Sequence, residues 1–179
     1  MEHQAPAKNE FFSILKTVII TFIVVLLIKT FILTPVNVKG VSMEPTYVNK
    51  DVVLVDRVTS LERFQQVVFE SPNNPDEWYI KRLIGLPGDK IEMKNDVLYV
   101  NDKPYEENYV KRSAKGINLR TTEDFEAIIV PKDKLFVMGD NRLNSMDSRH
   151  FGFIEKDIIM GKVLATVYPF TNIGLAKKQ

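Results

Sequence analysis

The sequence contains no cysteine and only two histidines, His3 and His150, among 179 residues. The missing thiols exclude disulfide bonds, thiolate nucleophiles and cysteine-ligated zinc. With two imidazoles a transition-metal site is not expected, and no acidic loop has EF-hand spacing. An excess of charge is missing as well, because 24 basic and 23 acidic side chains leave a net charge of +1. The composition therefore gives no electrostatic reason to expect nucleic-acid binding.

A long apolar run stands near the N-terminus instead. Residues 11–33 carry only two charges, Lys16 and Lys29, both near the ends of the run. As a helix this run extends about 34 Å, enough to cross a bilayer, and lysine stems can reach the headgroups. A buried core helix is seldom apolar all round for this length, and no small-x-small cleavage site follows, as it would in a cleavable signal peptide. The run predicts a retained single-pass anchor.

The anchor divides the chain into a tail of residues 1–10, a transmembrane segment of residues 11–33 and a domain of residues 34–179. Lys8 and Lys16 on one side face Lys29 and Lys39 on the other. The positive-inside rule therefore does not decide the orientation.

Residues 34–179 are expected to be mainly β. Short runs of β-branched and aromatic residues alternate with turns rich in glycine, proline and asparagine. The segment 106–127 is polar and irregular, which predicts a surface excursion. The pattern predicts antiparallel sheets, either packed together or barrel-like. The expected strands cover 36–43, 51–58, 65–71, 77–85, 127–141 and 161–170, with a hairpin over 90–105 that bends at Asn95 and Asp96.

Ser42 lies in the loop-like stretch GVSMEPT and raises the question of a general base. A hydroxyl nucleophile needs a proton acceptor, and with histidine almost absent the candidates are lysine and carboxylates. Lysine acts as a base only if burial lowers its pKa from about 10.4 toward neutrality. Lys81 lies in the apolar stretch WYIKRLIG, where strand alternation puts it beside Tyr79 and Leu83. Taken singly, Lys81 is equally well a strand lysine that reaches water, and Ser42 an ordinary loop hydroxyl.

Other candidates explain less. Ser13 and Lys16 have S-x-x-K spacing but lie within the anchor. A dyad of Asp140 and Asp147 would leave Ser42 and Lys81 unexplained, and His150 is expected to be a packed or exposed neighbour. Charges without an obvious partner, Arg142 and the run KRSAK at 111–115, are expected to be solvated.

Four motifs in a fixed order resemble one family. GVSMEPT follows the anchor, and DVVLVDR, YIKRLIGLPGD and MGDNRLNSMDSRHFG come after it. Together they resemble the bacterial type I signal peptidases, especially the compact Gram-positive kind. That resemblance implies a membrane-bound serine endopeptidase with a β-fold and without metal or cofactor. Such an enzyme would act on secretory preproteins at the outer face of the cytoplasmic membrane, where the secretion translocase is a possible partner.

The resemblance also implies roles for individual residues. Ser42 is the nucleophile, Lys81 the general base, and Ser145 the hydroxyl that orients the Lys81 amine. Many Gram-negative members have a hydroxyl residue where this chain, like the usual Gram-positive pattern, has Gly40. The oxyanion is therefore expected to rely on the Ser42 N–H, with help from the compact Gly40 backbone or from a water. Leu143 stands at a commonly polar place in the last motif.

Charge pairing predicts a supporting network. Asp147 and Arg149 are expected to pair with Arg82, next to Lys81, and Asp140 to serve the same loop. The cleavage rule implied by the resemblance is small-x-small, which needs shallow apolar pockets. The residues expected to line them are Val36, Val38, Met43, Tyr79 and Ile80.

Two alternatives to an active signal peptidase remain. A catalytically silent, membrane-anchored β-domain that binds secreted chains is opposed by the presence of both Ser42 and Lys81. A self-processing regulator of the same catalytic type is opposed by the anchor and by the lack of a DNA-binding segment.

Overall fold

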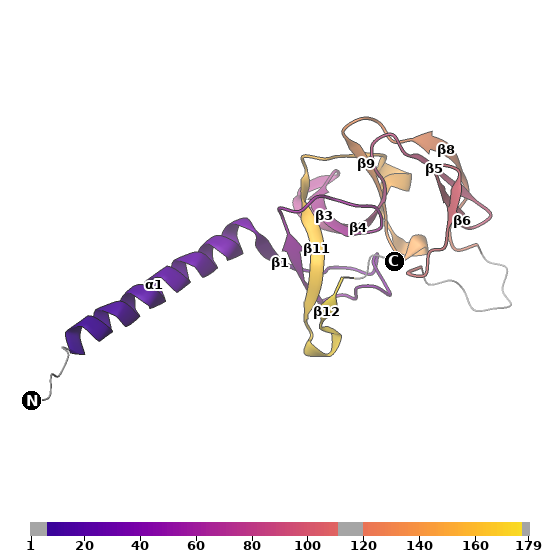
Figure 1. Ribbon diagram of the computed structural model, residues 1–179. Coiled ribbons are helices and arrows are strands. Elements are labelled where there is room, and N and C mark those ends of the chain that lie inside the picture. The colour runs from indigo at the N-terminus through magenta and orange to yellow at the C-terminus, as the bar shows by residue number, and fades with distance from the viewer. Residues whose placement is uncertain (1–6, 111–119, 177–179) are drawn as a thin grey trace, which may run out of the picture.

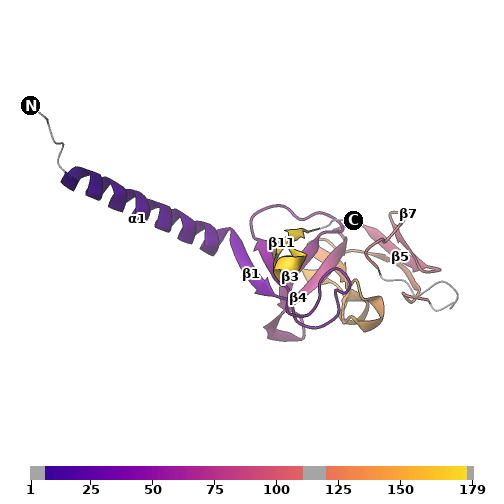
Figure 2. The same cartoon turned by 90° about the horizontal axis from the view of Figure 1, so that it is seen from below.

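The computed structural model describes residues 7–110 and 120–176 and consists of one long helix followed by antiparallel sheets (Figure 1). Helix α1 (Ala7–Phe31) projects away from the β-domain and meets it at β1 (Leu33–Asn37), as both views show (Figures 1 and 2). The helix thus begins before the expected anchor of 11–33 and ends at Phe31, since Leu33 already belongs to a strand. The expected mainly β fold with one apolar N-terminal helix is confirmed.

No part of the window Glu10–Leu27 is buried inside the protein. By length and composition this window is able to cross a membrane. A helix that packed into the core would bury one face, so the interpretation of the apolar run as a core helix is excluded.

All strand pairs in the two sheets are antiparallel. The larger sheet has eight strands in the order β1-β2-β11-β3-β4-β9-β10, with β12 beside β11. This order is an open path from β1 to β10, so the sheets pack together without forming one closed ring. Its other strands are β2 (Val52–Asp56), β3 (Gln66–Ser71), β4 (Asn74–Gly85), β9 (Lys134–Met138), β10 (Ile154–Glu155), β11 (Ile159–Tyr168) and β12 (Gly174–Leu175).

The smaller sheet lies on the far side of the domain from α1 (Figure 1). Its order is β7-β6-β5-β8. Its strands are β5 (Lys90–Lys94), β6 (Val97–Val100), β7 (Lys103–Tyr105) and β8 (Phe125–Ile129), and the short helices of the domain are η1 (Arg142–Asn144), α2 (Ser148–Phe151) and η2 (Phe170–Asn172).

The local strand predictions were confirmed in part. The hairpin β5–β6 bends at Asn95 and Asp96, which adopt φ of 53° and 62°, as tight hairpin turns require. The strand expected over 36–43 was wrong beyond Asn37, because the chain turns there and Gly40 has a φ of +82°. The segment expected over 127–141 is two strands, β8 and β9. Of the excursion 106–127, residues 111–119 lie outside the described residues.

Strand β4 connects the three hydrophobic clusters of the core. Alternation along it sends Tyr79 and Leu83 into the cluster around Phe69, and sends Ile80 and Ile84 to two other clusters. Because both faces of β4 are covered, a lysine at position 81 lies inside the protein.

Candidate active site

The segment that carries Ser42 is a loop that packs against β4. After β1 the chain turns at residues 40–46, and Val38 and Met43 bury their side chains beneath it. The Tyr47 N–H donates to the Met43 carbonyl over 3.0 Å, which closes the turn. Ser42 itself is half-buried, so its hydroxyl faces both the protein and the groove beside it.

The Lys81 amine meets the Ser42 hydroxyl. Lys81 Nζ donates to Ser42 Oγ over 2.6 Å, although the two residues lie on different elements. Lys81 is only 4% exposed, and its Nζ lies 5.2 Å from the centre of the Tyr79 ring. The expected pair of Ser42 and Lys81 is therefore in contact.

Burial lowers the pKa of Lys81 from 10.5 to about 8. Desolvation disfavours the ammonium form, while the charges of Asp147 and Asp140 raise the pKa and oppose it, and that of Arg149 lowers it further. Near pH 8 a large fraction of the amine is thus neutral and able to accept a proton.

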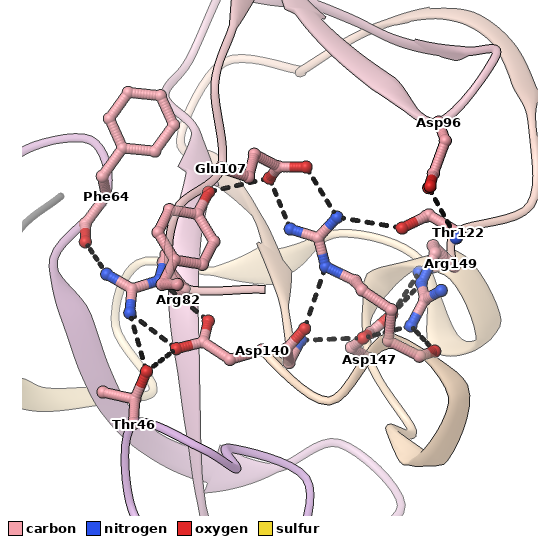
Figure 3. Close-up of polar contacts among 12 residues, drawn as sticks. Thr46, Phe64, Arg82, Asp96, Glu107, Thr122, Asp140, Asp147 and Arg149 are labelled. Carbon is pink, nitrogen blue, oxygen red and sulfur yellow. Dashed lines mark hydrogen bonds and ion pairs between the residues drawn. The ribbon is translucent and has the colours of Figure 1, made fainter. Parts of the chain in front are cut away.

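The two aspartates of the last motif each hold an arginine. Arg82 donates to both carboxylate oxygens of Asp140, over 2.8 and 2.6 Å, and Arg149 donates to Asp147 (Figure 3). The prediction that Asp147 and Arg149 pair with Arg82 was wrong, because Asp147 and Arg149 pair with each other and Arg82 pairs with Asp140. Arg82 points from the face of β4 opposite to Lys81, where Asp140 lies and Asp147 does not.

These ion pairs also argue against an aspartic dyad of Asp140 and Asp147. Burial alone would raise the pKa of Asp147, but the hydrogen bonds and charge of Arg149 outweigh it and the pKa is lowered. An aspartic dyad needs one carboxyl group that stays protonated, whereas Asp147 and Asp140 are both ion-paired. His150 is exposed and lies beside Asp147, consistent with the expected neighbour role.

Arg142 was predicted to be solvated, and this was wrong. Its side chain is fully buried and donates to both oxygens of Glu107, with Nη1 to Oε2 at 2.9 Å (Figure 3). It also donates from Nε to the Gly139 carbonyl. The partner stands 35 positions earlier, in a segment expected to be irregular, so no local pattern in the sequence indicated the pair. The run KRSAK lies outside the described residues.

Ser145 is buried beside Gly139 at the back of the site. A Cβ at Gly139 would lie 2.1 Å from Ser145 Oγ and 2.5 Å from the Ser42 carbonyl oxygen, so only glycine fits between them. Within the described part of the chain the Ser145 hydroxyl has no well-formed hydrogen bond, but it lies near the Asp147 carboxylate and helps to lower the pKa of that group. Its expected role in orienting the Lys81 amine stays a prediction.

A groove of about 190 Å³ opens beside the pair. Of the residues expected to form substrate pockets, Val38, Met43, Tyr79 and Ile80 line it. Val36 does not; it packs against the cluster beneath the loop. The remaining lining residues are Asn37, Lys39, Gly40, Ser42, Trp78, Lys81 and Met146, of which Trp78 and Met146 were missed because exposed apolar side chains are common on surfaces.

The backbone at Ser42 leaves a donor free. Among the described residues the Ser42 N–H makes no hydrogen bond. The Gly40 N–H is already taken, since it donates to Asn49 Oδ1 over 3.2 Å. Gly40 therefore offers the oxyanion no free N–H. What it can contribute is space, because no atom beyond Gly40 and its chain neighbours lies within 4 Å of the place where a Cβ would stand.

The fold and the site define a membrane-anchored β-protein with a buried lysine at a serine hydroxyl. Residues 11–168 match the family model described as signal peptidase, peptidase S26. The chain is 41% identical over 169 residues to a signal peptidase I P of Bacillus subtilis subsp. natto, which covers 90% of this chain and 91% of that protein. It is 37% identical to signal peptidase IB of Staphylococcus aureus over 92% of this chain and 93% of that one.

A solved structure agrees with these sequences. The signal peptidase I of Enterococcus faecalis superposes with a TM-score of 0.54 at 35% identity, over 59% of this chain and 97% of that one. The chain therefore belongs to the signal peptidase family, peptidase S26. The predicted class, a membrane-anchored serine peptidase that acts on signal peptides, is confirmed.

Proposed function

We propose that Ser42 and Lys81 form the catalytic dyad of this peptidase. The observation that carries the proposal is the 2.6 Å contact between Lys81 Nζ and Ser42 Oγ at a lysine whose burial lowers its pKa to about 8. The neutral amine accepts the Ser42 proton as the hydroxyl attacks the scissile carbonyl, and then donates a proton to the leaving amine. The free Ser42 N–H stabilises the oxyanion that develops during attack.

The substrate preference follows from the shape of the groove. Its floor near Ser42 is made by the apolar side chains of Val38, Met43 and Ile80. A groove of about 190 Å³ shared between several substrate side chains favours small ones at the positions that point inward. We therefore expect cleavage of secretory preproteins after small-x-small sequences.

Orientation and partners extend the same proposal. The tail before α1 lies in the cytoplasm and the β-domain on the outer face of the cytoplasmic membrane, since signal peptides present their cleavage sites there. Only ten residues separate the end of α1 at Phe31 from Ser42, so the nucleophile stays within roughly 35 Å of the helix end. A translocase that delivers the preprotein is the expected neighbour.

The test is cleavage of a purified preprotein by the purified full-length chain in detergent, read by product masses. Ser42→Ala and Lys81→Arg are expected to abolish cleavage, because the first lacks the nucleophile and the second stays protonated. The matched control is Ser60→Ala, which removes an exposed loop hydroxyl away from the groove. Full turnover by the Ser42 variant would contradict the dyad, and an inactive wild type would favour the silent-domain alternative.

A further inference from the structure

Two consecutive carbonyl groups of the nucleophile loop are held by one residue from a distant segment. Asn141 Nδ2 donates to the Val41 carbonyl over 3.0 Å, and the Asn141 N–H donates to the Ser42 carbonyl over 3.0 Å. Because a carbonyl oxygen only accepts hydrogen bonds, the amide nitrogen of Asn141 must face Val41. Asn141 thereby fixes both peptide groups that flank the Ser42 Cα.

The first of these peptide groups contains the proposed oxyanion donor. The Val41 carbonyl and the Ser42 N–H belong to the same planar unit, and this peptide bond is trans. In a trans unit the carbonyl and the N–H point in opposite directions, so a bond that fixes the oxygen also fixes where the hydrogen points. The Ser42 N–H makes no hydrogen bond of its own among the described residues, so its direction depends on what holds the Val41 oxygen.

The Val41 oxygen accepts a second hydrogen bond, but this bond does not fix the orientation of the Val41–Ser42 peptide plane relative to the rest of the domain. The Glu44 N–H donates to the Val41 oxygen over 3.1 Å, but Glu44 belongs to the same turn and would move with it. Asn141 comes from a segment that is itself held on several sides. The Arg142 Nε donates to the Gly139 carbonyl, and Asp140 is paired with Arg82. Thr46, at the far end of the loop, also donates to Asp140 Oδ2, but at the Val41 and Ser42 peptide groups the link to this segment is Asn141.

We propose that Asn141 is a positioning residue that aims the Ser42 N–H at the developing oxyanion. The proposal rests on the proposed function of Ser42 as nucleophile and N–H donor. It assigns Asn141 a role in the transition state and none in substrate binding, since its side chain is directed at the loop backbone and is not part of the groove lining. The Lys81 amine is not among its partners.

The test compares kcat, KM and the pH dependence of kcat for the full-length wild type, Asn141→Ala and Asn141→Asp with a preprotein. Both variants lose the donor to Val41 and keep the backbone N–H that bonds Ser42. Loss of an oxyanion donor costs about 10²–10³-fold, and loss of its alignment alone is expected to lower kcat about 10–100-fold. KM should stay within about twofold, because the interaction acts only in the transition state. In Asn141→Ala, which adds no charge, the pH limb assigned to Lys81 should not move.

The matched control is Leu143→Ala, which truncates a 70% exposed side chain of η1, the turn that Asn141 precedes. It is expected to keep wild-type kcat. Asn141→Asp conserves size, so it gives a second variant if the alanine variant unfolds, as a thermal melt would report. An unchanged kcat in either folded variant overturns the proposal, as does a rise in KM alone or a pH limb that is shifted in Asn141→Ala. Ser42→Ala is measured alongside: its retained activity would refute the proposed function, whereas an inactive Ser42→Ala with a fully active Asn141 variant refutes only this inference.

Discussion

Lys81 differs from every other described lysine of the chain in being buried. It lies on a strand whose two faces are both covered, and the Ser42 hydroxyl is in contact with its amine. The low exposure shifts its protonation equilibrium by disfavouring the ammonium form. A lysine without this burial would be protonated and inactive as a base at neutral pH.

The rate of cleavage is expected to rise with pH through about 8. The Lys81 amine must be neutral to accept the Ser42 proton, and burial lowers its pKa to about 8. The measurement is kcat/KM against pH from 6 to 10 with a preprotein. His150→Ala should follow the wild-type curve, because His150 is exposed and lies beside Asp147. A rise with pH that disappears in His150→Ala would instead make His150 the base.

The same burial is expected to lower stability below pH 8. The unfolded chain binds the Lys81 proton up to a pKa near 10.5, whereas the folded chain releases it near 8, so the free energy of unfolding rises with pH between these values. Below pH 8 the full cost of burying the ammonium, about 3 kcal/mol, is present. Lys81→Met removes the titration, so it should be more stable than the wild type below pH 8.

The excess stability of Lys81→Met should shrink as the pH rises from 8 to 10.5. Urea unfolding of both proteins at pH 7 and pH 10 checks this. If the difference in stability between the two proteins is the same at pH 7 and pH 10, the Lys81 amine is not desolvated, contrary to the structure.

At the scale of elements, buried ion pairs hold the last motif against the rest of the domain. Arg82 on β4 pairs with Asp140, and Arg142 in η1 pairs with Glu107, which lies between β7 and β8 of the smaller sheet. Asp147 accepts from the Gly139 N–H and caps α2, where it also accepts from the Arg149 N–H. The segment that carries Asn141 is therefore fixed by Arg82 and Glu107 from two other parts of the chain and by Asp147 from its own motif.

Glu107→Ala is expected to destabilise the domain by about 3–5 kcal/mol, because it leaves the Arg142 guanidinium buried without its carboxylate. The double variant Glu107→Leu with Arg142→Met should lose less, since no charge stays buried. Chemical unfolding of the single and double variants gives the comparison. Glu155→Ala is the control: it breaks an exposed pair with Lys134 and should cost under about 1 kcal/mol. A double variant less stable than Glu107→Ala would contradict this assignment.

At the scale of the whole molecule, α1 and the β-domain are two parts joined at β1 (Figures 1 and 2). The window Glu10–Leu27 buries nothing in the domain, so its apolar surface is left for the bilayer. This separation allows the domain to face one side of the membrane while the helix spans it.

Protease added to intact spheroplasts is expected to digest the β-domain and leave a membrane-protected fragment that contains α1. The expectation follows from the proposed outer position of the domain. Residues 111–119 include the run KRSAK, which offers trypsin sites in the domain, and immunoblotting with an N-terminal tag would report the fragment. Protection of the whole domain until the membrane is dissolved would reverse the proposed orientation.

The sequence by itself determined the parts that depend on local patterns. The predominantly apolar run of residues 11–33 can satisfy its backbone in a bilayer only as a helix, and Asn95-Asp96 between alternating strands favours a hairpin bend. The ordered motifs indicated the family and the pair of Ser42 and Lys81.

Only the tertiary structure decided which distant groups meet. Hydrogen bonds and ion pairs depend on distance in space, so the sequence could not assign Arg82 to Asp140 or bury Arg142 against Glu107. For the same reason it gave no sign that Asn141 holds the carbonyl of Val41, 100 positions earlier. The pKa of Lys81 was decided in the same way, because desolvation comes from the strands and loop that cover β4 and not from the neighbours of Lys81 along the chain.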